Sequence, residues 1–388
     1  MSAMKPIKVL ENLIQSGPLF RDVISSGNIP VLRRLLGPAI RGLLFQVGKN
    51  NPITFAKASY ETSFDWEYRR EFPEMQKLYE QAKKKQWNAS TDINWNVDVD
   101  PHNPEFDLMP DSYIPTVNMP VWRNLTRKEK NEQKHGLMSW ILSQFLHGEQ
   151  GAIFASAQVT NSVPWFDAKL FGSSQVIDEG RHVEAFYRYI DGKLNKLYPI
   201  NDNLYVIIES LMLDSDWDMK FLGMQIMIEG LALGAFGAIR GITKEPLLRE
   251  MLKYVITDEA RHVHFGVLSL SRFFNNPDLC SEKMVKERED WAFEISGLLR
   301  NRFLAHEFYD EYYGHIMSRK EWDSIILESS IMGVFRDTMF KRIIPNLRKI
   351  GLLSERIQPY YQELGVLRYK DGKAATEVEL SELMGAAG

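Results

Sequence analysis

Two parts of the chain repeat one arrangement of acidic and histidine residues. In each part a lone glutamate inside an apolar run is followed 30 residues later, from 149 to 179 and from 229 to 259, by a Glu-x-x-His motif. The six residues of the two copies are Glu149, Glu179, His182, Glu229, Glu259 and His262. Positions i and i+3 share one face of a helix, with Cβ atoms about 5–6 Å apart. The repeat therefore predicts a helical core into which four segments carry acidic side chains.

Prolines separate the segments that carry the repeat. A crowded stretch predicts an extended, turn-rich connection, and it holds Pro101, Pro104, Pro110, Pro115 and Pro120. Long proline-free windows with helical spacing of Leu, Met, Ala, Ile and Glu follow, delimited by Pro164, Pro199, Pro246 and Pro277. These windows predict four antiparallel helices. Pro246 is expected in the first turn of the fourth helix, where its missing N–H costs nothing.

The residue types of the repeat predict a dinuclear metal site in the middle of this bundle. Each Glu-x-x-His pair can bind one ion, and the two lone glutamates can act as terminal or bridging carboxylates. Four carboxylates would neutralise two divalent cations, whereas four ionised glutamates buried without metal would be severely desolvated. Mixed oxygen and nitrogen donors suit iron or manganese. Apolar residues one turn away on the same faces, such as Phe145 and Ile226, predict that the site is dry.

The two motifs are also alike around their ligands, because both read DE-x-RH. A metal-bound histidine usually donates its other ring N–H to a carboxylate, which fixes the ring. We therefore expect an aspartate and an arginine from each motif to support the histidines, and these residues are Asp178, Arg181, Asp258 and Arg261. His264 and His147 are out of phase with the ligands and are not expected to bind metal.

Composition limits the remaining classes of function. A net charge of −4 suggests neither nucleic acid nor anionic lipid as a partner. The single cysteine, Cys280, excludes an internal disulfide and an iron–sulfur cluster held by four thiolates, and it fits a cytoplasmic location. No uninterrupted apolar run reaches the length of a membrane-spanning helix. The basic, amphipathic segment 29–49 is interpreted as a helix that packs on the bundle, and its alternative is an interfacial helix. The packing interpretation places Leu32, Leu36, Ile40 and Leu43 against the bundle.

The chain is expected to form a single domain, 1–388, because no linker divides it. Within it, 1–120 would hold N-terminal helices and the proline-rich connection, 121–276 the metal-binding core, and 277–388 a helical extension. A helix is expected over about 68–86, and two or three more over about 279–365, with Pro345 as a kink or break. The last residues, "TEVELSELMGAAG", are expected to be a loosely held tail. Packing anchors between the N-terminal layer and the core, rather than radical relays, are expected at Trp66, Trp87 and Trp95.

From about residue 125 to 275 the motifs resemble the ferritin-like, ribonucleotide-reductase-like superfamily of non-haem di-iron carboxylate proteins. The doubled DE-x-RH looks most like its oxygenase branch. The resemblance implies an all-α, ferritin-like four-helix bundle in which the six residues bind two iron ions that cycle between Fe(II) and Fe(III). A manganese–iron pair is an alternative. It also implies O2 as co-substrate, a homodimer, and an external electron donor such as a ferredoxin or a flavin reductase.

The leading hypothesis is a monooxygenase or hydroxylase that acts on a largely hydrophobic small molecule, with Glu229 as the carboxylate that shifts during the reaction. The multicomponent monooxygenases carry a threonine where this chain has Leu233. Alternatives within the superfamily are an arylamine N-oxygenase, which normally adds a histidine ligand, and an acyl desaturase. A radical-generating protein is a third alternative, although the radical tyrosine of that class is replaced here by Phe186, with Tyr187 one residue further.

Overall fold

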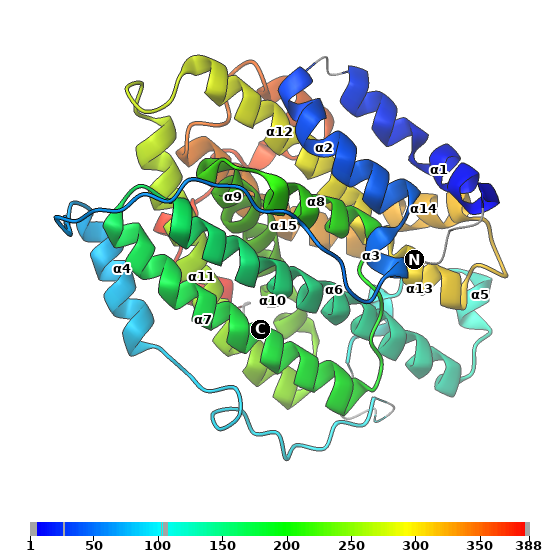
Figure 1. Cartoon of the computed structure of the whole chain (residues 1–388). Coiled ribbons are helices and arrows are strands. Elements are labelled where there is room, and N and C mark those ends of the chain that lie inside the picture. Colours follow the sequence, from blue (N-terminus) through cyan, green and yellow to red (C-terminus); the bar gives the residue numbers. More distant parts are fainter. Residues whose placement is uncertain (1–5, 26–27, 102, 104–107, 385–388) are drawn as a thin grey trace.

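The computed structural model describes residues 6–25, 28–101, 103 and 108–384, and this part of the chain is helical without any β-strand (Figure 1). The prediction of an all-α fold is confirmed. The core is a bundle of four long helical segments, each containing a part of the repeat. They are α6 (Arg127–Ser162), α7 (Phe166–Tyr189), the continuous segment α9–η5–α10 (Trp217–Phe221, Leu222–Ile228, Glu229–Ile242) and α11 (Pro246–Phe274).

Local sequence explains where these helices begin. Thr126 caps α6 by accepting a hydrogen bond from the backbone of Glu129, while the Glu129 carboxylate accepts one from the Thr126 backbone. Pro246 is the first residue of α11, as predicted, and the Glu245 carboxylate accepts hydrogen bonds from the backbone N–H groups of Leu247 and Leu248, which have no partner within the helix. The caps therefore set the ends of the segments between which the repeated glutamates lie.

The third segment is the most apolar part of the bundle. Trp217–Ile242 is long and apolar enough to cross a membrane by length and composition, and 94% of its most apolar window is buried within the protein. The sequence-based expectation counted only uninterrupted apolar runs and missed this helix. The core helix of a soluble protein passes the same test. Its middle part is a π-helix, η5, that ends directly before Glu229.

Further helices come before, between and after the four core segments in the sequence. The N-terminal elements are α1 (Pro6–Ser25), α2 (Ile29–Ala39), η1 (Ile40–Leu44), α3 (Val47–Asn50), α4 (Pro73–Lys84), η3 (Asp111–Tyr113) and α5 (Pro120–Arg123). Two elements lie between α7 and α9, namely η4 (Ile190–Leu194) and α8 (Asp202–Leu213). The C-terminal elements are α12 (Glu282–Asn301), η6 (Arg302–Leu304), α13 (His306–Tyr312), α14 (Arg319–Glu328), α15 (Ser330–Lys349), α16 (Gln358–Glu363), η7 (Leu367–Tyr369), η8 (Ala375–Glu377) and α17 (Leu380–Leu383).

Several boundaries differ from the sequence-based expectations. The helix expected over 68–86 begins only at Pro73, whose fixed φ suits a first helical position. The window between Pro199 and Pro246 contains two separate helical segments, because α8 ends before the third core segment begins. The region 279–365 holds more helices than the two or three expected. Pro345 lies inside α15 and does not end it.

The segment 29–49 packs against the protein, but partly through a different face from the one expected. Val31, Leu35 and Pro38 of α2 are buried, whereas Leu36 is 38% exposed. Arg34 forms ion pairs with Asp214, Asp216 and Glu287. These ion pairs help to set the rotation of the helix about its axis. Amphipathic spacing alone predicted a buried face that is one residue away from the observed one.

Two further expectations for the periphery are wrong. Trp66 is 75% exposed and anchors nothing, whereas Trp87 and Trp95 are buried. The C-terminal tail is not loose as far as residue 384, because Leu383 is buried and the Met384 carbonyl accepts a hydrogen bond of 2.6 Å from Arg240 of α10. The final four residues of the expected tail, 385–388, lie outside the described part of the chain.

Candidate metal centre

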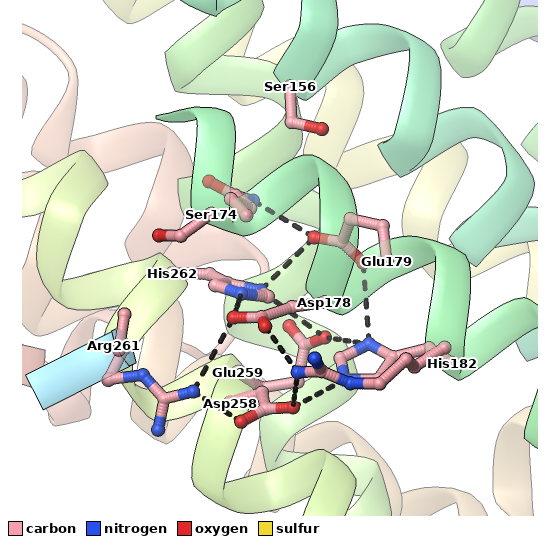
Figure 2. Close-up of polar contacts among 12 residues, drawn as sticks. Ser156, Ser174, Asp178, Glu179, His182, Asp258, Glu259, Arg261 and His262 are labelled. Atoms are coloured by element: carbon pink, nitrogen blue, oxygen red, sulfur yellow. Dashed lines mark hydrogen bonds and ion pairs between the residues drawn. The ribbon is translucent and has the colours of Figure 1, made fainter. Parts of the chain in front are cut away.

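The four core segments bring the six residues of the repeat into one buried cluster. Its members are at most 5% exposed, and they are Glu149 of α6, Glu179 and His182 of α7, Glu229 of α10, and Glu259 and His262 of α11. Figure 2 shows the α7 and α11 members facing one another across the bundle. Fixed helical spacing places the Glu and His of each motif on one face, and antiparallel packing turns the two faces together.

Two overlapping groups of side chains could each hold a metal ion, with potential ligand atoms within 4.8 Å of one another. The first group is Glu149, Glu179, His182 and Glu259, and the second is Glu179, Glu229 and His262. The two groups therefore do not follow the two Glu-x-x-His motifs, whose assignment to one ion each stays a prediction. Glu179 belongs to both groups, and Glu259 of the second motif joins the first.

The two imidazoles show this sharing directly. His182 Nδ1 lies 3.2 Å from Glu149 Oε2, 3.4 Å from Glu179 Oε2 and 3.2 Å from Glu259 Oε1. His262 Nδ1 lies 3.1 Å from Glu179 Oε1 and 3.6 Å from Glu259 Oε1. Glu179 and Glu259 thus each contact both histidines.

The remaining two glutamates lie at opposite ends of the cluster. Glu149 contacts His182, whereas Glu229 Oε2 is 4.0 Å from His262 Nδ1. Gln175, one turn before Glu179 on α7, donates hydrogen bonds of 3.0 Å to both Glu179 Oε1 and Glu229 Oε1. This glutamine links a central carboxylate to an outer one. Its position four residues from Glu179 was a signal in the sequence that went unused.

The other ring nitrogen of each histidine faces an aspartate of the opposite motif. His182 Nε2 lies 3.2 Å from Asp258 Oδ2, and His262 Nε2 lies 3.2 Å from Asp178 Oδ2. The expected support of the histidines by aspartates is therefore present, but it is exchanged between α7 and α11.

Arginines tie the two aspartates together. Arg181 forms a close ion pair with Asp178 and lies 3.4 Å from Asp258. Arg261 repeats the pattern with a close pair to Asp258 and a distance of 3.4 Å to Asp178 (Figure 2). The two aspartates and two arginines form a neutral square on one side of the cluster.

Sequence reasoning missed the contact of Trp87 with this square. Trp87 follows α4, and its indole N–H donates a hydrogen bond of 2.7 Å to Asp258 Oδ2, the same oxygen that His182 contacts. The indole also stacks on the His182 ring at a centroid distance of 6.3 Å and lies under the Arg181 guanidinium. No spacing relates Trp87 to the motifs, so only the docking of the N-terminal layer shows its role.

Five buried atoms at the centre of the cluster have no hydrogen-bond partner among the described residues. They are Glu179 Oε2, Glu229 Oε2, both carboxylate oxygens of Glu259, and His262 Nδ1. Buried polar atoms without partners each cost about 1–3 kcal/mol, and such groups are rare in folded proteins. The unpartnered atoms face one another and are all potential metal ligands, so the residues present fit a pair of cations.

Burial and the close approach of charged groups shift the pKa values of the glutamates in the cluster. Burial and the charge of Glu259 raise the pKa of Glu149 well above its usual range, and burial with the charge of Glu179 does the same for the pKa of Glu229. Burial also opposes ionisation of Glu179, but the charges and hydrogen bonds of His262 and His182 together outweigh it and lower the Glu179 pKa. Binding of cations would displace the protons that the outer carboxyls hold.

Aromatic and aliphatic side chains close the cluster off on the side of α6 and α10. Phe145 packs on Phe236 at a ring-centroid distance of 4.6 Å, and both contact Phe186. A small cavity reaches the cluster from this side, and its wall includes Glu149, Glu229, Glu259, Ala152, Ala232 and Arg302. His264 belongs to neither ligand group, and His147 contacts the Tyr198 carbonyl instead.

The fold and site define a helical-bundle protein with a buried carboxylate–histidine centre, as the ferritin-like resemblance implied. No family model matches the sequence, and no curated protein matches it. Solved structures of R2-like ligand-binding oxidase do match. One variant with an anaerobically reconstituted Mn/Fe cofactor shows 19% identity and a TM-score of 0.42 over 68% of this chain and 93% of that chain. A second such variant shows 21% identity and a TM-score of 0.40 over 75% of this chain and 96% of that chain. A form with an aerobically reconstituted Mn/Fe cofactor shows 18% identity and a TM-score of 0.42 over 72% of this chain and 98% of that chain.

Proposed function

We propose that this chain is an O2-activating, non-haem di-metal oxygenase of the monooxygenase type, which oxidises a largely hydrophobic organic substrate. The observation that carries the proposal is the convergence of four carboxylates and two imidazoles in a dry site, with five ligand-type atoms lacking hydrogen-bond partners. Two redox-active ions bound there would supply the electrons that reduce O2. Oxygen and nitrogen donors without thiolate suit iron or manganese.

In this proposal the six residues of the repeat hold the ions and their neighbours hold the ligands still. Glu179 and Glu259, which contact both histidines, would be the central ligands, and Glu149 and Glu229 would be the outer ones. The charged square of Asp178, Arg181, Asp258 and Arg261 fixes the orientation of both imidazoles. Aspartate partners of this kind also raise the basicity of a ligating histidine.

Glu229 is the carboxylate that we propose shifts when the site changes redox state. Its Oε2 is free of hydrogen bonds and lies 4.0 Å from His262, the longest of the histidine–glutamate distances. It follows directly on the π-helix η5, a type of irregularity frequent at functional sites. It also lines the cavity that reaches the cluster. Gln175 would keep one Glu229 oxygen in place while the other moves.

The electrons are proposed to come from an external donor of the ferredoxin or flavin-reductase type. The sequence has one cysteine and no dinucleotide-binding fingerprint, so it offers no residues for an internal iron–sulfur or Rossmann-type redox site. The fitting metal pairs are iron–iron and manganese–iron. The arylamine N-oxygenase alternative is less well supported, because His264 does not join the ligand groups.

One observation favours the radical-generating alternative. Trp87, an oxidisable side chain, is joined to His182 through Asp258 by a hydrogen bond of 2.7 Å and a contact of 3.2 Å. Against it, the tyrosine position of that class is occupied by Phe186, and Tyr187 is 50% exposed. Anaerobic reduction of the metal-loaded protein followed by exposure to O2 separates the two functions. A persistent organic radical favours the alternative, and a rapid decay that substrate accelerates favours the oxygenase.

Metal content tests the site itself. The wild-type protein is expected to bind two ions per chain, and E179Q is expected to lose both, because Glu179 belongs to both ligand groups. E149Q and E229Q are each expected to retain about one ion, since each outer carboxylate belongs to a single group. The matched control is E184Q on the exposed side of α7, which should retain two. Two ions in E179Q, or no O2 consumption by the reduced wild-type protein with any of a panel of aromatic, acyl and amine substrates, would contradict the proposal.

A further inference from the structure

Arg302 is a buried arginine that has no charged partner among the residues that the structure describes. It is the first residue of η6, directly after α12, and only 4% of it is exposed. Among the hydrogen bonds and ion pairs of the described residues, none involves its guanidinium group, whose neighbour is the ring of Phe303 at 5.1 Å. Burial alone lowers the pKa of Arg302 to about 10, with no acidic group that offsets it. An arginine almost never stays buried unless it is paired.

Other buried arginines of this chain show how unusual this is. Arg288 is 2% exposed and forms ion pairs with Asp216, Asp218 and Glu287. Arg261 is 6% exposed and pairs with Asp258 and Asp178. The protein therefore neutralises these buried guanidinium groups with its own carboxylates, whereas no carboxylate in the described part of the chain pairs with Arg302.

Arg302 lies at the junction of two cavities. It lines the cavity at the metal centre together with Glu149, Glu229 and Glu259. It also lines a second, almost wholly apolar cavity whose wall includes Trp140, Ile141, Phe303, Ile326, Met332 and Phe335. Gln144 and Phe145 are likewise part of both walls. One molecule could therefore contact the apolar wall, the guanidinium group and the edge of the cluster at once.

The charges around the proposed metal site leave Arg302 uncompensated. Four carboxylates of the cluster would balance two divalent cations, with both histidines neutral as ligands. Asp178 and Asp258 balance Arg181 and Arg261. One positive charge remains, on Arg302, beside an apolar cavity. A single buried positive charge calls for a ligand with a single negative charge.

We propose that Arg302 binds the carboxylate of the substrate, so that the substrate is an apolar monocarboxylic acid whose hydrocarbon or aromatic body occupies the second cavity. This inference rests on the proposed function and specifies its substrate class. A guanidinium group matches a carboxylate with two parallel hydrogen bonds. A phosphate monoester fits less well, because its charge of about −1.5 to −2 would leave buried negative charge unbalanced. The carboxylate end of the acid then lies nearest the metal centre.

The test compares acids with neutral amides of the same shape. The probes are 3-phenylpropanoate and hexanoate, with 3-phenylpropanamide and hexanamide as their partners, titrated calorimetrically into the metal-loaded protein. The wild-type protein is expected to prefer at least one acid over its amide by about tenfold or more, the range of a charged hydrogen bond. R302M is expected to lose this preference while its affinity for the amides changes little. The matched control is R300M, two residues earlier at the end of α12 and outside both cavity walls, which should keep the preference for the acid.

Thermal unfolding without added acid separates a binding role from a structural one. An unpaired buried charge destabilises the fold, so R302M is expected to unfold at the same or a higher temperature than the wild type. R288M, which removes the ion-pair partner of the buried Asp218, is expected to unfold at a lower temperature. If R302M does not fold, R302K serves in its place, since it keeps the charge and loses the fork geometry, and should weaken acid binding with little effect on the amides.

The inference is wrong if neither acid binds the wild type more tightly than its amide, or if R302M keeps the preference. It is also wrong if R302M unfolds well below the wild type, because Arg302 would then support the fold. These readouts are independent of the proposed oxygenase activity. A protein that prefers acids through Arg302 but consumes no O2 would contradict the proposed function and retain the inference. A protein that consumes O2 but shows no preference for acids through Arg302 would retain the proposed function and contradict the inference.

Discussion

His182 on α7 contacts Asp258 on α11 at 3.2 Å, and the same relationship holds in reverse between His262 and Asp178. Each histidine is thus oriented by the aspartate of the other motif. The exchange joins the two helices at the level of the ligands, so a movement of one helix along the other would disturb both ligand groups. The arginines extend this joint, because each of them pairs with both aspartates.

The exchange predicts that an aspartate substitution acts on the distant histidine. Asp258→Asn should weaken metal binding at the group of His182 by about 10–100-fold, because a ligating histidine loses its charged partner. Asp178→Asn should weaken the group of His262. Anaerobic Fe(II) titration against a competing chelator measures the two affinities.

Outer-carboxylate variants reveal which group has been weakened. Combined with E149Q, which damages the His182 group, D258N should leave the second ion in place, whereas D258N with E229Q should lose both. If D258N instead weakens the group of His262, each aspartate serves its own motif and the exchange has no functional weight.

Gly234 predicts a structural sensitivity of the segment that carries Glu229. A Cβ at this position would lie 2.8 Å from the Thr338 carbonyl oxygen of α15. Gly234→Ala is therefore expected to push α10 and α15 apart and to lower the free energy of unfolding by about 1–3 kcal/mol. Metal occupancy should fall as well, since Glu229 is on the displaced helix. The control is Gly241→Ala on the same helix, which meets nothing within 4 Å and should stabilise by about 0.5–1 kcal/mol. Urea unfolding and metal analysis provide the measurements, and equal stability of the two variants would refute the close contact.

Lys220 predicts a specific dependence of stability on pH. It is fully buried in α9, where it donates hydrogen bonds to Gln158 and to the Leu211 carbonyl, and burial lowers its pKa to about 8. The pKa of an unfolded lysine is about 10.4. Below pH 8 both states hold the proton and the full penalty for the buried charge applies. Between pH 8 and about 10.4 the folded state has released its proton and the unfolded state has not, so stability rises with pH.

The comparison with Lys220→Met isolates this effect, because all other titrating groups are shared. Between pH 7 and 10 the wild type should gain about 2–3 kcal/mol of unfolding free energy relative to K220M, at about 1.36 kcal/mol per unit of pKa difference. Urea unfolding at several pH values measures it. A constant difference between the two proteins across this range would show that Lys220 titrates normally.

Much of the fold could be predicted because its signals are local. The positions of the proline-free windows, the first turn of α11 at Pro246 and the shared face of each Glu-x-x-His motif depend on residues a few positions apart. The face of α2 was placed wrongly because the ion pairs of Arg34 reach to Asp214 and Glu287, far along the chain. Likewise, α15 continues past Pro345, and this continuity depends on the packing of α15 against α10.

The sequence by itself determined that six side chains would project from four helices toward a common interior, since helical periodicity relates spacing along the chain to direction. Only the tertiary structure decided that Glu179 and Glu259 are central, that the aspartates are exchanged, and that Trp87 and Arg302 lie at the site. The physical reason is that contacts between helices depend on how the helices are rotated and shifted against one another. That arrangement results from the packing of many distant residues at once, and no short stretch of sequence contains it.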